Sequence, residues 1–330
     1  MKTLEKQTSR EIKDSGGFTI TELLAIIATV AMLAALLLPA VARAAGQSQG
    51  AKCLNNIRQL ILAAQMYATD NVGLWFPNQP GEPDWVQDPM SWTTNNPANT
   101  NWQYLITSPA PGSNPNAYSP YNSFFTPYIK DPSIYRCPAD PSVVGGVARI
   151  RSYSANQAIG TCWTGVTTGC LYGQADQHVT GQWLPGAGGD NDCQDYGFTY
   201  QKLSQMVRPK PTTLFVFAEE HPDSINDSTL AVQIGQTGLG GGAWIDVPSN
   251  LHNGAGSFSF ADGHAEIHKW VGRLMSTLTY VQNGYVPEIN YEGANQPTAD
   301  TAADLKDLNW VQARTSYPIA SANQKGFPAP

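Results

Sequence analysis

Charged side chains are scarce in this 330-residue chain, and no excess of basic residues is present. Charged residues make up 14% of the sequence and leave a net charge of −7. This balance argues against a nucleic-acid-binding surface. Glycine (30), proline (24) and tryptophan (9) are abundant, which favours a loop-rich, β-rich globule. The length allows a sizeable core in one or two domains.

Common catalytic motifs are also missing. The sequence has no P-loop and no H-E-x-x-H motif, so we expect a protein that is not an enzyme. No two of its five cysteines have C-x-x-C spacing, which argues against a zinc knuckle or a thioredoxin-like site. The cysteines are Cys53, Cys137, Cys162, Cys170 and Cys193.

Disulfides are the expected state of these cysteines if the globular part lies outside the cytoplasm, with one thiol left over. Cys162 and Cys170 flank a short Thr/Gly loop and are a candidate local pair. The sequence leaves the connectivity open.

One long apolar segment stands near the N-terminus. Residues 18–42 read FTITELLAIIATVAMLAALLLPAVA and carry a single charge, Glu22. At about 1.5 Å per residue, a helix of this length can cross a hydrocarbon core of roughly 30 Å. Because the segment is apolar on all sides, it predicts a membrane-inserting helix.

Three kinds of processing fit such a segment. It could be a secretory signal cut near Ala-Arg-Ala at 42–44, an uncleaved anchor, or an anchor retained after a cut between Gly17 and Phe18. Glu22 favours the third, because a carboxylate at membrane depth costs roughly 2.5–3.5 kcal/mol and needs a partner. A cut before Phe18 creates a new α-amino group that can pair with Glu22 of a neighbouring subunit.

The run GGFTITELL at 16–24 resembles the N-terminus of type IV prepilins and type II secretion pseudopilins. The resemblance implies that a prepilin peptidase cuts after Gly17 and that the amine of Phe18 is methylated. It also implies that Glu22 acts in assembly. Pro39 stands where such pilins often carry a proline that loosens the helix, as its missing N–H would also do on physical grounds.

The expected fold is α+β and pilin-like. A leader, 1–17, precedes a spine helix, 18–70, and an extracytoplasmic β-rich head, 71–330, built on antiparallel sheet with long loops. Helical periodicity continues past the apolar segment and ends near Asp70, with one stripe formed by Leu54, Ile57, Ile61 and Ala64.

In the head, residues 212–219 predict a β-strand and residues 256–270 a hairpin. A two-residue turn at Asp262-Gly263 would pair Phe260 with Ala265 and Phe258 with Ile267, with Glu266 and His268 on the opposite, polar face. Residues 151–200 read as an insertion of Gly/Thr-rich loops. The tail beyond Pro287 lacks periodicity and predicts a surface-wrapping or partly disordered segment.

A second resemblance joins several stretches of the head. His252, nine intervening residues and Asp262-Gly263 are similar to the H-x9-DG element of a large bacterial group of pseudopilin-like proteins. The segments around Cys53, Cys137 and Phe217, and the stretch SYSAN at 152–156, resemble that group's other recurring stretches. The resemblance implies a Cys53–Cys137 disulfide between spine and head, but no biochemical role.

Two candidate ligand sites emerge. Acidic and histidine residues are concentrated at Glu219, Glu220, His221, His252, Asp262, His264, Glu266 and His268. Within this set, His264, Glu266 and His268 alternate along a strand and could hold a divalent metal, although a solvated stripe is the commoner reason for such a pattern. His252 and Asp262 could instead be structural, with Asp262 capping its own turn. The acidic loop with Asp190, Asp192 and Asp195 could bind Ca²⁺, but it lacks full EF-hand spacing.

The sequence therefore predicts a subunit, of major or minor type, of a type IV pilus-like filament or a type II secretion pseudopilus. Its partners would be prepilin peptidase, other pilin or pseudopilin subunits and the inner membrane, with no nucleic acid. The alternative is a membrane-tethered extracytoplasmic module that binds carbohydrate, through Trp-rich loops that include Trp92 and Trp102, or a metal.

Overall fold

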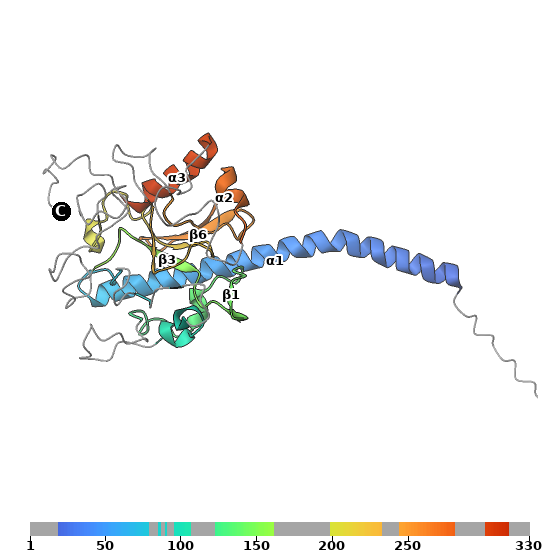
Figure 1. Cartoon of the computed structure of the whole chain (residues 1–330), viewed down its shortest axis with the longest axis horizontal. Coiled ribbons are helices and arrows are strands. Elements are labelled where there is room, and N and C mark those ends of the chain that lie inside the picture. The colour runs from blue at the N-terminus through green and yellow to red at the C-terminus, as the bar shows by residue number, and fades with distance from the viewer. Residues whose placement is uncertain are drawn as a thin grey trace, which may run out of the picture. The chain divides into compact units, whose positions relative to one another are not determined.

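The chain combines one long N-terminal helix with a head built around a mixed β-sheet, as the computed structural model shows (Figure 1). The structure describes residues 19–78, 85–86, 90, 96–106, 123–161, 199–232, 244–280 and 301–316. The helices are α1 (Ile20–Asp70), α2 (Arg273–Thr277) and α3 (Ala302–Thr315), with 3-10 turns η1 (Pro97–Asn99), η2 (Trp102–Leu105), η3 (Pro132–Tyr135) and η4 (Leu203–Gln205). The strands are β1 (Val143–Val144), β2 (Val147–Ala148), β3 (Tyr153–Asn156), β4 (Phe215–Glu219), β5 (Thr229–Leu230), β6 (Ala255–Phe260) and β7 (Ala265–Lys269).

The predicted spine helix is present, and its C-terminal end falls at Asp70 as expected. It continues through Pro39 without a break. The chain divides into two compact units, Met1–Ala45 and Gly46–Pro330. In the first unit, the large apolar side chains of α1 are exposed. Among the described residues, Ile20–Leu38 is the one helical stretch whose length and composition suit a membrane crossing.

The second unit contains a five-stranded sheet in the order β5-β3-β4-β6-β7. The pair β3–β5 is parallel, and the other three pairs are antiparallel. Residues 46–70 of α1 lie over one face of this sheet, whereas α2 and α3 lie over the other (Figure 1). The sheet is therefore buried between two apolar clusters.

The first cluster confirms the predicted stripe of α1. Ile57, Ile61 and Ala64 are fully buried, and Leu54 packs at the edge. On the opposite side of this cluster Phe217 stacks on Phe76, with ring centroids 5.4 Å apart. The second cluster joins the other face of β4 and β6 to residues of α2 and α3, including Met275, Leu308 and Val311.

A register shift in β4 decides which side chains face α1. The ladder between β4 and β6 is irregular between Phe215 and Phe217. As a result Phe215 joins the second cluster, while Val216 and Phe217 both join the first. Beyond this β-bulge the strand alternates again, and Glu219 points to the side of the sheet where α1 lies.

The predicted hairpin exists as β6–β7, but the predicted register was wrong by one residue. Phe258 lies opposite Glu266, not Ile267. The loop has three residues, 261–263. The N–H of Phe260 donates to the carbonyl of His264 (2.9 Å), and the carbonyl of Phe260 accepts the N–H of Gly263 (2.9 Å), which takes a φ of +96°. Glu266 and His268 therefore share a face with the phenylalanines.

Two other expectations need correction. Residues 151–161 do not belong to an inserted loop, because they contain β3, an inner strand with all four residues buried. The tail beyond Pro287 includes α3, whose first turn is capped by the hydroxyl of Thr301, which accepts the N–H of Asp304 (3.1 Å). Residues 162–198 lie outside the described residues.

Candidate functional site

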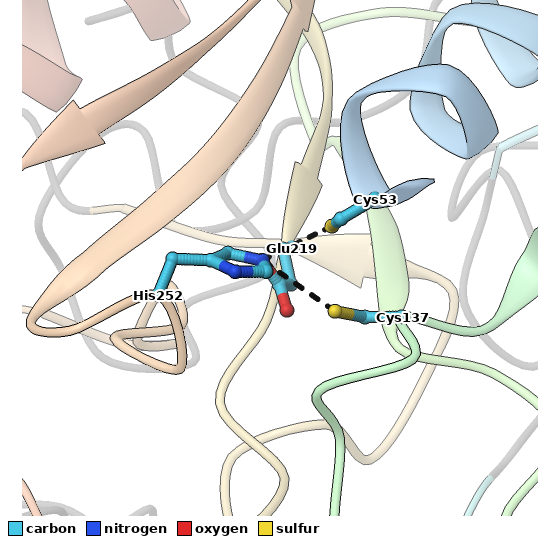
Figure 2. Close-up of side chains that lie close together, drawn as sticks. All are labelled: Cys53, Cys137, Glu219 and His252. Atoms are coloured by element: carbon cyan, nitrogen blue, oxygen red, sulfur yellow. Dashed lines mark hydrogen bonds and ion pairs between the residues drawn. The ribbon is translucent and has the colours of Figure 1, made fainter. Parts of the chain in front are cut away.

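Four side chains of metal-binding type converge between α1 and the sheet. They are Cys53, Cys137, Glu219 and His252. Their ligand atoms (two Sγ, one carboxylate oxygen and one ring nitrogen) all lie within 4.8 Å of one another. Figure 2 shows the four side chains pointing toward one another from a helix, a strand and two loops. Three are fully buried, and the side chain of His252 is only 5% exposed.

Cys53 lies on the buried stripe of α1 and is the only one of the four residues that the helix contributes. The helix comes close to the sheet at Gly50, one turn earlier. A Cβ at that position would lie 3.2 Å from Ile267 Cδ1 and 3.7 Å from His252 Nδ1. The hydroxyls of Tyr153 and Ser257 each lie 3.1 Å from Cys53 Sγ.

Cys137 follows η3, which starts where the carboxylate of Asp131 accepts the N–H of Ser133. The N–H of Cys137 donates to the hydroxyl of Ser152 (3.1 Å). The N–H of Ala139 donates to Cys137 Sγ (3.3 Å). These bonds fix both the backbone and the sulfur of this residue.

Glu219 is the last residue of β4, and one of its two carboxylate oxygens is well satisfied. Its Oε2 accepts hydrogen bonds from the hydroxyl (3.1 Å) and the N–H (3.4 Å) of Ser257. Its Oε1 is buried and has no hydrogen-bond partner among the residues that the structure describes. An orphaned, buried carboxylate oxygen is costly unless something binds it.

His252 is held by a tight turn just before β6. Its N–H donates to the carbonyl of Ala255 (3.1 Å), and Asn253 and Gly254 take positive φ values of +57° and +75°. Its Nε2 lies 3.1 Å from Glu219 Oε2 and 3.5 Å from Cys137 Sγ. The histidine of the H-x9-DG element therefore lies at the centre of the site.

Two groups of the site have pKa values below their usual range. Burial raises the pKa of Glu219, but the hydrogen bond and charge of His252 outweigh it and leave that pKa below its usual value. Burial also raises the pKa of Cys53, yet hydrogen bonds with Cys137 and His252 lower it overall. In both groups the interactions with neighbouring side chains outweigh the effect of burial.

The other two groups hold protons in the absence of a metal. Hydrogen bonding to Cys53, followed by burial, raises the pKa of the Cys137 thiol. Burial lowers the pKa of His252, but its hydrogen bonds with Cys53 and Glu219 raise it overall to about 10. His252 is therefore positively charged beside the carboxylate of Glu219.

The expected Cys53–Cys137 disulfide is absent from the structure, which has both residues as free cysteines. The two sulfurs do come together, but the imidazole of His252 and the carboxylate of Glu219 converge on the same point. The sulfurs are thus parts of a four-ligand set.

The other predicted ligand stripe does not converge on a metal position. His264 stacks on Phe260 (4.3 Å) and contacts Asp262 through Nδ1 (2.6 Å). His268 stacks on Trp310 (3.6 Å). The expected capping role of Asp262 is confirmed, since its Oδ1 accepts the N–H of His264 (3.1 Å). Asp262 and Gly263 shape the hairpin and lie outside the four-residue site.

Other predicted residues lie elsewhere. Glu22 is exposed on the first turn of α1. Trp102 is 51% exposed, whereas Trp75 and Trp85 are buried in the first cluster. The remaining ones fall outside the described residues: Gly17, Phe18, Trp92, Cys162, Cys170, Asp190, Asp192, Cys193 and Asp195.

No local sequence pattern combines the two cysteines with Glu219 and His252. The sequence pointed to Cys53 and Cys137 as a pair and placed Glu219 and His252 in a different, acidic set. Each of the four residues lies in a stretch that resembles a recurring stretch of the same bacterial group. This common resemblance is the one signal in the sequence that could have linked them. Comparisons with protein-family models, with curated proteins and with solved structures find no match to this chain.

Proposed function

We propose that this chain is a pilin-like subunit of a type IV pilus-like filament or a type II secretion pseudopilus. Prepilin peptidase cuts between Gly17 and Phe18, the apolar part of α1 anchors the chain in the inner membrane, and the head lies outside the cytoplasm. Assembly then packs this helix against those of other pilin or pseudopilin subunits.

The observation that carries the proposal is the first half of α1. Its large apolar side chains, from Ile20 to Leu38, are exposed, and Glu22 is the single charged residue in residues 19–42. A helix that is apolar on all sides needs lipid or other apolar helices around it. A lone carboxylate within it needs a cationic partner, which the free α-amine of Phe18 in a neighbouring subunit supplies.

Glu22 also has a local role that the test must separate from assembly. Its carboxylate accepts the N–H of Thr19 (2.9 Å), and the hydroxyl of Thr19 accepts the N–H of Glu22 (3.3 Å). This pair is a capping box, which stabilises the start of α1. Glutamine can serve in a capping box as well as glutamate, but it carries no charge.

Glu22→Gln therefore tests the assembly role directly. It keeps the cap and removes the charge, so we expect filaments in the pelletable fraction of cells to be lost while the protein stays in the membrane. Thr19→Ala is the matched control, because it breaks the cap and leaves the charge, and it should still assemble. Normal assembly of Glu22→Gln would contradict the proposal and favour the tethered binding module.

A further inference from the structure

We propose that Cys53, Cys137, Glu219 and His252 form a structural Zn²⁺ site that fastens residues 46–70 of α1 to the sheet of the head. The proposal concerns the second unit alone and does not depend on the role of Glu22 in assembly.

The spacing of the ligand atoms fits a tetrahedral ion. Zn²⁺ bonds of about 2.0–2.3 Å give a tetrahedron with edges of roughly 3.3–3.8 Å. In the site, Nε2 of His252 lies 3.1 Å from the Glu219 oxygen and 3.5 Å from Cys137 Sγ. Cys53 Sγ lies 3.6 Å from that oxygen. All six separations are at most 4.8 Å, so side-chain shifts of up to about 1 Å would place an ion among the four atoms.

The types of ligand select the metal. Two thiolates, one imidazole and one carboxylate suit Zn²⁺, whereas Ca²⁺ and Mg²⁺ require oxygen ligands. Two thiolates and a carboxylate carry three negative charges, and a divalent cation offsets two of them. Binding displaces protons from the thiols and from His252, so affinity falls as pH is lowered.

A second observation, independent of the convergence, points to a ligand. Glu219 is fully buried, and its Oε1 lacks a hydrogen-bond partner in the described part of the chain. Rotation or bidentate binding of the carboxylate would satisfy this oxygen with the ion. The N–H of Ala139 on Cys137 Sγ and the hydroxyl of Ser257 on Glu219 orient the ligands, as outer-shell groups do in metal sites.

The site is of the closed kind. Four protein side chains fill four positions and leave none for substrate, which is the pattern of a structural centre. The ligands come from α1, the loop after η3, the end of β4 and the turn before β6. One ion therefore joins four segments that are distant in sequence, and it does so at the point where the helix packs on the head.

The test is the zinc content of the full chain, purified in detergent with a thiol reductant and without chelators, measured by plasma mass spectrometry. We expect about one Zn²⁺ per chain and, since loss of one of four ligands removes the closed site, at least a tenfold lower content for Cys137→Ser and His252→Gln. The matched control is His264→Gln, a histidine of the adjacent hairpin, which should keep its zinc.

Cobalt provides a readout that does not depend on a variant folding. The wild-type chain, stripped of zinc and loaded with Co²⁺, should show thiolate-to-metal absorption in the near ultraviolet and the strong visible bands of tetrahedral Co²⁺. Glu219→Gln should shift the visible bands.

Three results would overturn the proposal. The first is a folded wild-type chain without zinc and without Co²⁺–thiolate absorption. The second is a peptide map, obtained without reductant, in which Cys53 is linked to Cys137 by a disulfide. The third is equal loss of zinc in His264→Gln and His252→Gln.

Discussion

His268 illustrates how the environment of one residue changes its chemistry. Its ring stacks on Trp310, with centroids 3.6 Å apart, and its buried Nε2 has no hydrogen-bond partner among the described residues. Burial, followed by the positive charges of Arg314 and Lys306, lowers the pKa of His268 from 6.5 to about 4. The folded chain therefore keeps this imidazole neutral where the unfolded chain protonates it.

This difference predicts a loss of stability in mild acid. Between pH 6.5 and about 4 the unfolded chain binds the proton and the folded chain does not. The contribution of His268 is present above pH 6.5 and is lost as the pH falls through that window. His268→Phe keeps a ring against Trp310 and removes the titration, so the variant should lose less stability than the wild type between pH 7 and pH 4.5.

The measurement is chemical denaturation of both full-length chains in the same detergent at the two pH values. The change in free energy of unfolding from pH 7 to pH 4.5 should be smaller for the variant. An equal change in both chains would show that His268 is not held neutral.

The sequence predicted the local bonding of some residues but not their burial. The cap of Asp262 was predictable because the acceptor lies two residues from its donor. His268 was expected on a solvated face, because nothing in the sequence showed that α3 would cover it. The observed register of the hairpin differs by one residue from the predicted one, and a one-residue slip exchanges the two faces of a strand. His268 therefore lies on the face that α3 covers.

At the scale of elements, two side chains of α3 cap the backbone at the start of α2. The carboxylate of Asp307, on α3, accepts the N–H groups of Val271 and Gly272 at 2.8–3.1 Å. Asp304 accepts the N–H of Leu274 (2.9 Å). These are donors at the start of α2 that have no partner within a helix of only five residues. The short helix depends on the longer one.

Asp307→Ala should therefore destabilise the head. Removing a buried acceptor leaves N–H groups unsatisfied, which costs about 1–3 kcal/mol. Asp307→Asn, which retains one acceptor oxygen, should cost less. Lys306→Ala is the control, because Lys306 is the exposed neighbour on the same helix, and its free energy of unfolding should stay within about 0.5 kcal/mol of wild type. Equal effects at 306 and 307 would contradict the capping role.

The elements differed in how far the sequence could predict them. The helix α1 was predicted because apolar residues with helical spacing continue for some fifty residues and end at a turn. The helix α3 was missed because two of its buried positions are Asp304 and Asp307, which look like surface residues until their partners on α2 are known. Likewise, β3 was not predicted as a strand, because it borders a Gly/Thr-rich region and its Ser and Asn side chains are polar, although all four residues are buried.

At the scale of the whole molecule, the sequence predicted an α+β chain with an apolar N-terminal helix and a β-rich head, and this level of description is confirmed. The meeting of Cys53, Cys137, Glu219 and His252 could not be predicted. It depends on strand order, on the bulge in β4 and on the turn before β6, and each of these is set by tertiary packing and not by local pattern.

The central claim, that the chain is processed and anchored as a prepilin, is tested most directly by mass spectrometry of the N-terminus of protein purified from its own membranes. The account predicts a chain that begins at Phe18 with a methylated amine and retains Glu22. A chain that begins at Met1, or one cut after the apolar segment near Ala45, would contradict it.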